Sequence, residues 1–99
     1  MGKPEAYIED YLGTQCKRFN FLCYKFVSPG HSGVPDRIII GNGYTIFVEL
    51  KKPGEKPRKL QEKIINKMTT HGAIVFAIDS KADIDVLMHA INANIIEKG

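Results

Sequence analysis

The sequence lacks the features that mark several familiar protein classes. Its two cysteines, Cys16 and Cys23, do not have the spacing of metal ligands, so we expect buried, reduced thiols. No apolar run approaches the roughly 20 residues that a membrane span needs. The amino-terminal stretch has no apolar core of a signal peptide, and Ala6 stands where N-myristoylation favours serine or threonine. These absences predict a cytoplasmic protein with no membrane partner.

Other absences narrow the function. There is no internal repeat, no zinc-finger spacing and no glycine-rich nucleotide loop, so we expect no small-molecule cofactor. What is present is an ordinary globular composition, 43% hydrophobic and 25% charged, in 99 residues. That length predicts one domain spanning residues 1–99, because a second hydrophobic core would not fit.

Positive charge is modest overall but unevenly distributed. The formal net charge is +3, which does not by itself indicate a nucleic-acid partner. Two glutamates, Glu55 and Glu62, are outnumbered within residues 51–67 by Lys51, Lys52, Lys56, Arg58, Lys59, Lys63 and Lys67. A basic segment of this kind suits a polyanion, although a solvated basic surface is the plainer interpretation.

The most informative stretch runs from residue 33 to residue 51. Asn42-Gly43 separates two β-branched and aromatic runs, and this dipeptide favours the positive φ angles of a type I′ hairpin turn. A two-residue turn makes facing residue numbers sum to 85, so Asp36 faces Glu49. Lys51 lies two residues beyond Glu49 and projects from the same face. The hairpin therefore gathers two carboxylates and an amine at one end.

Facing carboxylates need a compensating cation. Like charges directly opposite on antiparallel strands are destabilising. Magnesium is commonly held by one or two carboxylates, with water or phosphate completing its shell. The Asp36 and Glu49 pair therefore predicts a magnesium site, with manganese as a substitute.

These residues resemble a known nuclease signature. Pro35-Asp36 followed by Glu49-Leu50-Lys51 resembles the PD-(D/E)XK motif, and Gly33-Val34 with the later Gln61 narrows the resemblance to the VRR-NUC family, over about residues 4–90. The resemblance implies a Leu50 carbonyl ligand, a first-helix glutamate near the metal, and a glutamine near the site. Its implied catalytic set is Asp36, Glu49, Lys51, Glu5 and Gln61.

The order of elements predicted along the chain is αβββαβα. We expect helices over residues 4–19 and 58–71 and a last helix whose apolar stripe extends to Ile95. Strands are expected over residues 21–27, 35–41, 44–51 and 73–78. The two hairpin strands are apolar on both faces, which predicts a position inside the sheet with cover on both sides. The last strand should be buried on both faces. This is the fold class of a restriction-endonuclease-like α/β core, with a mixed central sheet flanked by helices.

Three candidate residues keep an alternative interpretation. Glu5 lies on the apolar arc of the first helix, which suits either a metal-site carboxylate or a favourable anion in a first turn, and Glu9 is the second choice for the site. Gln61 lies on an apolar arc and is either structural or functional. His31 either contacts DNA or assists proton transfer, or it is a mobile loop histidine.

The expected activity is hydrolysis of phosphodiester bonds in DNA. Lys51 would orient or deprotonate the attacking water, which requires it to lose its proton near neutral pH, or it would neutralise developing charge. Phosphates would be contacted by Lys52, Lys56, Arg58, Lys59 and His31. A small domain without a recognition element favours shape-selective recognition, and symmetric cutting favours a homodimer. Stand-alone VRR-NUC domains resemble Holliday junction resolvases in this respect, and the resemblance implies Holliday junctions or similar branched DNA as the substrate. The alternatives are a flap or single-strand nuclease, a module of a larger complex, and a non-catalytic DNA-binding module.

Overall fold

The computed structural model describes the backbone of residues 4–97 and the side chains from residue 6 to residue 97. The order of elements is the predicted one. It comprises α1 (Pro4–Arg18), β1 (Leu22–Lys25), β2 (Arg37–Gly41), β3 (Tyr44–Leu50), α2 (Lys59–Thr70), β4 (Ile74–Ile78) and α3 (Lys81–Asn92). None of the described helices is long and apolar enough to cross a membrane.

The four strands form a mixed sheet in the order β1-β2-β3-β4. The first two pairings are antiparallel, whereas β3 and β4 run parallel. Facing residues of β2 and β3 run from Arg37 opposite Val48 to Gly41 opposite Tyr44. Asn42 and Gly43 have φ angles of 48° and 86°, as the turn requires. The predicted register and the central position of both hairpin strands are confirmed.

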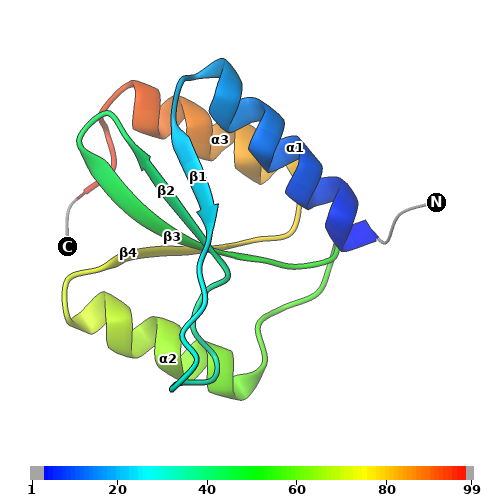
Figure 1. Cartoon of the computed structure of the whole chain (residues 1–99), viewed down its shortest axis with the longest axis vertical. Coiled ribbons are helices and arrows are strands. Elements are labelled where there is room, and N and C mark those ends of the chain that lie inside the picture. Colours follow the sequence, from blue (N-terminus) through cyan, green and yellow to red (C-terminus); the bar gives the residue numbers. More distant parts are fainter. Residues whose placement is uncertain (1–3, 98–99) are drawn as a thin grey trace.

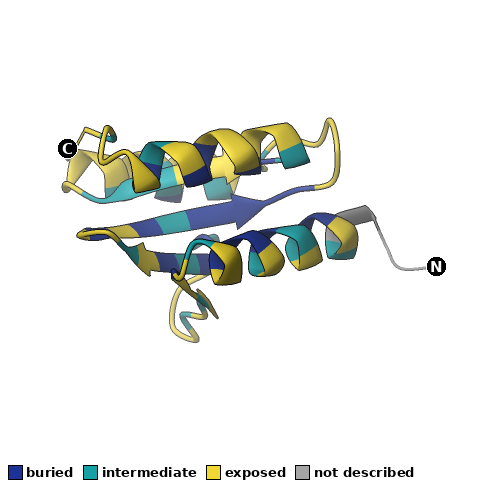
Figure 2. Cartoon of the chain, turned by 90° about the horizontal axis from the view of Figure 1, so that it is seen from above, coloured by how far each residue is buried: buried dark blue, intermediate teal, exposed yellow. Residues whose placement is uncertain are grey.

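The main core lies on one face of the sheet, beneath α1 and α3 (Figure 1). Both helices present apolar stripes at helical spacing, and β2 and β3 contribute every second residue. Figure 2 shows the buried side of α1 turned toward the strands and its exposed side turned outward. The fully buried members include Ile8, Leu12, Ile39, Ile46, Val48, Ile84, Met88 and Ile91.

Among the described residues, α2 and the loop before β2 cover part of the opposite face of the sheet (Figure 1). Ile40 is consequently 37% exposed, so the prediction of cover on both sides of the hairpin is wrong at the turn end. The last strand is also less buried than predicted, since Phe76 is 37% exposed and Ala77 is exposed. The physical reason is that β4 is an edge strand and α2 is too short to cover the whole sheet.

The end of α3 also differs from the prediction. The helix stops at Asn92, and Asn94 takes a positive φ of 56°, so Ile95 leaves the apolar stripe and is 71% exposed. The Asn42 side-chain amide donates to the Ile91 carbonyl oxygen at 2.7 Å. The hairpin turn thus adds a second donor to a carbonyl at the helix end that also accepts from the Asn94 backbone N–H at 3.1 Å.

Candidate active site

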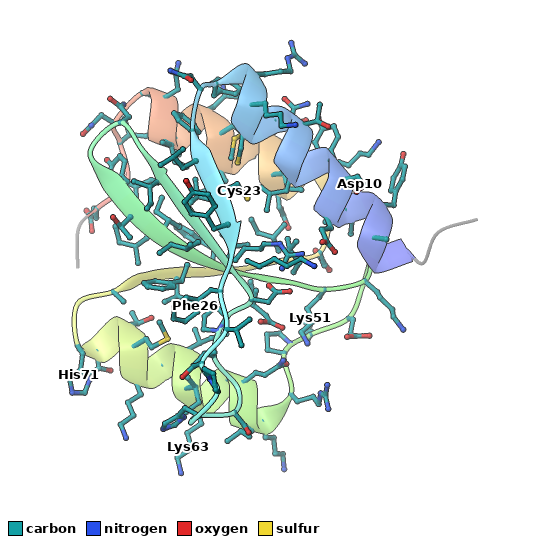
Figure 3. The ribbon with its side chains drawn as sticks, viewed as in Figure 1. Asp10, Cys23, Phe26, Lys51, Lys63 and His71 are labelled. Carbon is teal, nitrogen blue, oxygen red and sulfur yellow. The ribbon has the colours of Figure 1, made fainter. Side chains whose placement is uncertain are left out.

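The predicted acidic and basic side chains meet at the end of the hairpin remote from its turn, on the α2 side of the sheet. Continuing the observed register by one pair sets Asp36 across from Glu49. Lys51 follows β3, and its amide donates to the Ile78 carbonyl oxygen at 2.9 Å, which extends the parallel pairing with β4. Figure 3 shows Lys51 where the chain leaves the sheet. Strand pairings on both sides of β3 therefore hold this backbone in place.

Glu49 is buried but fully engaged. Its residue is 5% exposed, and its Oε2 accepts from Gln61 Nε2 at 3.0 Å and lies 3.2 Å from Lys51 Nζ. Burial raises the pKa of this carboxyl, and the Asp36 charge raises it further, while hydrogen bonding and attraction from Lys51 oppose the shift. Burial and the neighbouring Asp36 charge thus both disfavour the ionised form of Glu49.

Gln61 connects this carboxylate to the start of α2. Its side-chain oxygen accepts from the Arg58 backbone N–H at 3.0 Å, one half of a capping box, while its amide nitrogen donates to Glu49. One side chain therefore fixes both the beginning of the helix and the orientation of Glu49. The structural interpretation of Gln61 is confirmed by these hydrogen bonds, and a part for it in the reaction stays a prediction.

Asp36 is held on one oxygen and open on the other side. Its Oδ1 accepts from the Leu50 backbone N–H at 3.0 Å. Its Oδ2 lies 3.6 Å from Arg37 Nη1, and the side chain is 42% exposed. Asp36 is the partner of Glu49 that solvent can reach, and an ion or a phosphate could approach from its side.

Arg37 is a site-supporting residue that the sequence analysis did not single out. It is 8% exposed, forms an ion pair with Glu9 of α1, and donates from Nη1 to the Asp36 carbonyl oxygen at 2.8 Å. An arginine on an otherwise apolar strand face must be paired, and this pattern in the sequence could have indicated the Glu9 contact. Among the described side chains, the contact that links Glu9 to Asp36 therefore runs through Arg37.

A small cavity of about 190 Å³ opens beside Lys51, between β4 and the connector that leads to α2. Glu55 Oε1 approaches Lys51 Nζ to 3.8 Å, and the Asp79 carboxylate accepts from the Gly54 N–H at 3.0 Å. These contacts shape the connector, and the sequence analysis assigned neither acidic residue. The predicted phosphate-contacting residues of the connector and helix start are all exposed, namely Lys52, Lys56, Arg58 and Lys59.

Comparison with known proteins finds a relative in sequence and a similar solved structure. No family model matches the chain. The sequence is 40% identical over 89 residues to "Putative nuclease p44" of Acyrthosiphon pisum secondary endosymbiont phage 1, an alignment that covers 89% of this chain and 95% of that protein. A solved structure of a VRR-NUC domain superposes with a TM-score of 0.82 and 27% identity, covering 89% of this chain and 97% of that one. The chain belongs to the VRR-NUC family of nucleases.

Three further residues of this VRR-NUC domain were predicted at the site, namely His31, Glu5 and Leu50. His31 is exposed in the loop before β2 and lines a separate cavity with Phe26. Glu5 belongs to the first turn of α1, but its side chain lies outside the described residues. Leu50 is 3% exposed, and its side chain belongs to the core. The structure thus brings Asp36, Glu49, Lys51 and Gln61 together, and it leaves His31 apart.

The donor set of the VRR-NUC site fits a hard divalent cation. Among the side chains that the structure describes, no three histidines, cysteines, aspartates or glutamates converge. Two carboxylates do converge, and magnesium needs only one or two from the protein. Burial and, after it, the neighbouring Asp36 charge raise the pKa of Glu49, and a bound cation would offset both effects. Asp36 and Glu49 would hold the ion, and the Leu50 carbonyl and Glu5 are the further predicted ligands.

Proposed function

We propose that this protein is a magnesium-dependent, structure-selective DNA endonuclease that resolves Holliday junctions or similar branched DNA as a homodimer. Manganese would substitute for magnesium. The observation that carries the proposal is the convergence of Asp36, Glu49, Lys51 and Gln61 in a VRR-NUC family member. The buried Lys51 ammonium lies 3.2 Å from the Glu49 carboxylate, which supplies a basic group beside the proposed metal ligands.

Each residue has a distinct task in phosphodiester hydrolysis. Water oxygen attacks phosphorus, the bond to one sugar oxygen breaks, the water loses a proton and the leaving oxygen gains one. When bound, the cation supplies counter-charge for the phosphate and acidifies water. Lys51, 5% exposed, orients or deprotonates the attacking water, or neutralises charge on the phosphate. Gln61 keeps Glu49 in place through its bond to Oε2.

The branched-DNA part of the proposal has support in size and charge. One chain carries one such site, and paired cuts on opposing strands are most simply made by a two-fold dimer. The exposed basic residues of the connector and α2 lie next to the site and can neutralise backbone phosphates. Contacts to the backbone recognise shape rather than sequence.

The deciding experiment incubates the protein with a mobile four-way junction and magnesium and maps cuts strand by strand. We expect paired, symmetric cuts and weaker cleavage of a linear duplex of equal length. Lys51→Ala should lower the cleavage rate by at least about a hundredfold, since general acid–base groups typically contribute about 10²–10⁴-fold. Lys51→Arg should fail similarly, because a guanidinium cannot give up its proton and differs in shape from an ammonium.

Controls separate the alternatives. Lys17→Ala removes an exposed lysine from α1, on the other face of the sheet, and should leave cleavage unchanged. Cuts on one strand alone, with flaps preferred over junctions, would replace the resolvase by a flap or single-strand nuclease. DNA binding with no cleavage in magnesium or manganese would contradict the nuclease assignment and leave a binding module.

A further inference from the structure

A second cavity lies along α2, on the same side of the sheet as the site. It measures about 430 Å³, which is within the usual range for small-ligand sites. Its apolar wall consists of Phe26, Val34, Ile64 and Met68. Figure 3 shows Phe26 between the sheet and α2 and Lys51 toward the beginning of that helix.

The cavity is built from fixed parts. The Phe26 ring packs edge-on against Phe47 of β3, with ring centroids 5.2 Å apart. Gly33, at a φ of 86°, seats the loop so closely on α2 that an added Cβ would lie 3.2 Å from both Leu60 and Ile64 side-chain carbons. The wall is therefore held by strand packing on one side and by helix contact on the other.

The rim of the cavity is cationic or hydrogen-bonding. Lys67 of α2, His71 directly after that helix, and Ser28 and His31 of the opposite loop complete the lining. Lys67, His71 and His31 are exposed, and Ser28 is half-buried. No carboxylate is among the residues that line it. An apolar, aromatic wall with a basic rim is complementary to a nucleobase whose flanking phosphates lie on the rim.

The cavity is within a few nucleotides of the site. Gln61, which touches Glu49, and Met68 lie seven positions apart in α2. That separation is about 10 Å at about 1.5 Å per residue, close to three base steps at about 3.4 Å each. A strand with its scissile phosphate at Asp36 could place a neighbouring base in the cavity.

We propose that this cavity binds an unpaired nucleobase one to three nucleotides from the scissile phosphate. The inference rests on the proposed nuclease function and specifies the substrate of that same site. A base inside a duplex must leave its stack to enter a pocket, which costs a few kcal/mol, whereas an unpaired base enters without that penalty. The cavity therefore selects DNA whose strand is open beside the cut, as at a branch point.

The test measures binding rather than cleavage. The cleavage-deficient Lys51→Ala protein is titrated with branched DNA carrying 2-aminopurine, scanned over the three positions on each side of the mapped cut. We expect one position whose fluorescence changes on binding. Removing that base as an abasic nucleotide should weaken binding by about 5- to 150-fold, the range for loss of one base–aromatic stack.

Matched variants locate the effect. Met68→Trp fills the cavity and should abolish both the fluorescence change and the abasic effect, whereas Asn66→Trp, exposed on the same helix but outside the lining, should preserve both. The comparison of intact with abasic DNA uses a protein whose cavity is unchanged. It therefore tests the proposal even if Met68→Trp fails to fold. Equal affinity for intact and abasic DNA at every position, in a protein that cuts branched DNA, would overturn the base pocket alone. A protein that binds no DNA would overturn the nuclease proposal as well.

Discussion

At the residue scale, the conflict between Asp36 and Glu49 has a measurable consequence. The pKa of Glu49 is raised above 4.5, so without metal the folded state holds a proton at pH values where the unfolded chain has lost it. The contribution of Glu49 to the free energy of unfolding is therefore greatest at low pH and falls as pH rises through the raised pKa. A cation bound between the two carboxylates would remove this loss.

Asp36→Asn tests that argument. An asparagine oxygen can still accept from the Leu50 N–H, but the charge that raises the Glu49 pKa is gone. In chelator, the fall in unfolding free energy between about pH 4 and pH 8 should be smaller, by about 1.4 kcal/mol for each pKa unit recovered. Urea unfolding measures this, with Asp10→Asn, an exposed α1 carboxylate, as the control. An identical pH dependence in wild type and Asp36→Asn would show that the two carboxylates do not interact.

The free state of the two cysteines was predictable from the sequence, but the contact between them was not. Both are free, as expected, and Cys16 is buried while Cys23 is half-buried. A hydrogen bond from the Cys16 thiol lowers the pKa of Cys23 to about 7, with Arg37 adding to the shift, although burial opposes it. Spacing alone could not show this, because the contact depends on how β1 folds back onto α1.

At the element scale, the capping box of α2 couples helix stability to the site. Gln61→Glu keeps an acceptor for the Arg58 N–H, and its negative charge suits a helix start, but it replaces the donor to Glu49 with a repelling carboxylate. We expect strongly reduced cleavage and, at neutral pH, a lower melting temperature than wild type, because the added carboxylate lies against the buried Glu49. Gln61→Ala should lose cleavage and also about 0.5–2 kcal/mol of stability. Circular dichroism melting and a junction-cleavage assay measure the two effects, and a Gln61→Glu protein that cuts normally would rule out this coupling.

Elements with local signals were predictable. Asn42-Gly43 fixed the hairpin register, Ser80 caps α3 by accepting from the Asp83 N–H at 3.1 Å, and Asn20 leaves α1 with a positive φ of 62°. The exposure of β4 was not predictable, since an apolar run does not reveal whether a strand lies at the sheet edge. The resemblance to VRR-NUC nucleases predicted Gln61 near the site. Its two hydrogen bonds, to the Arg58 N–H and to Glu49, were not predictable, because the second depends on how α2 lies relative to β3.

At the scale of the whole molecule, the basic connector and α2 make a prediction about assembly. Each phosphate contact contributes about −0.9 to the slope of log affinity against log salt on duplex DNA. Arg58→Ala, at an exposed position, should reduce that slope by about one in a monomer but by about two in a symmetric dimer. Fluorescence anisotropy over a salt series measures it, with Lys17→Ala on the opposite face as the control. A change of one unit, together with monomeric sedimentation on bound junction, would contradict the homodimer.

The side chain and the backbone of Leu50 have different roles. Its side chain is 3% exposed in the core, whereas its amide holds Asp36 at 3.0 Å. Natural variation at position 50 should therefore follow the volume rules of a packed interior, accepting isoleucine or methionine. Proline would be excluded even where its volume fits, since it has no N–H to give Asp36. The residue between Glu49 and Lys51 can thus vary among related nucleases without a change in the reaction, because its backbone rather than its side chain contacts Asp36.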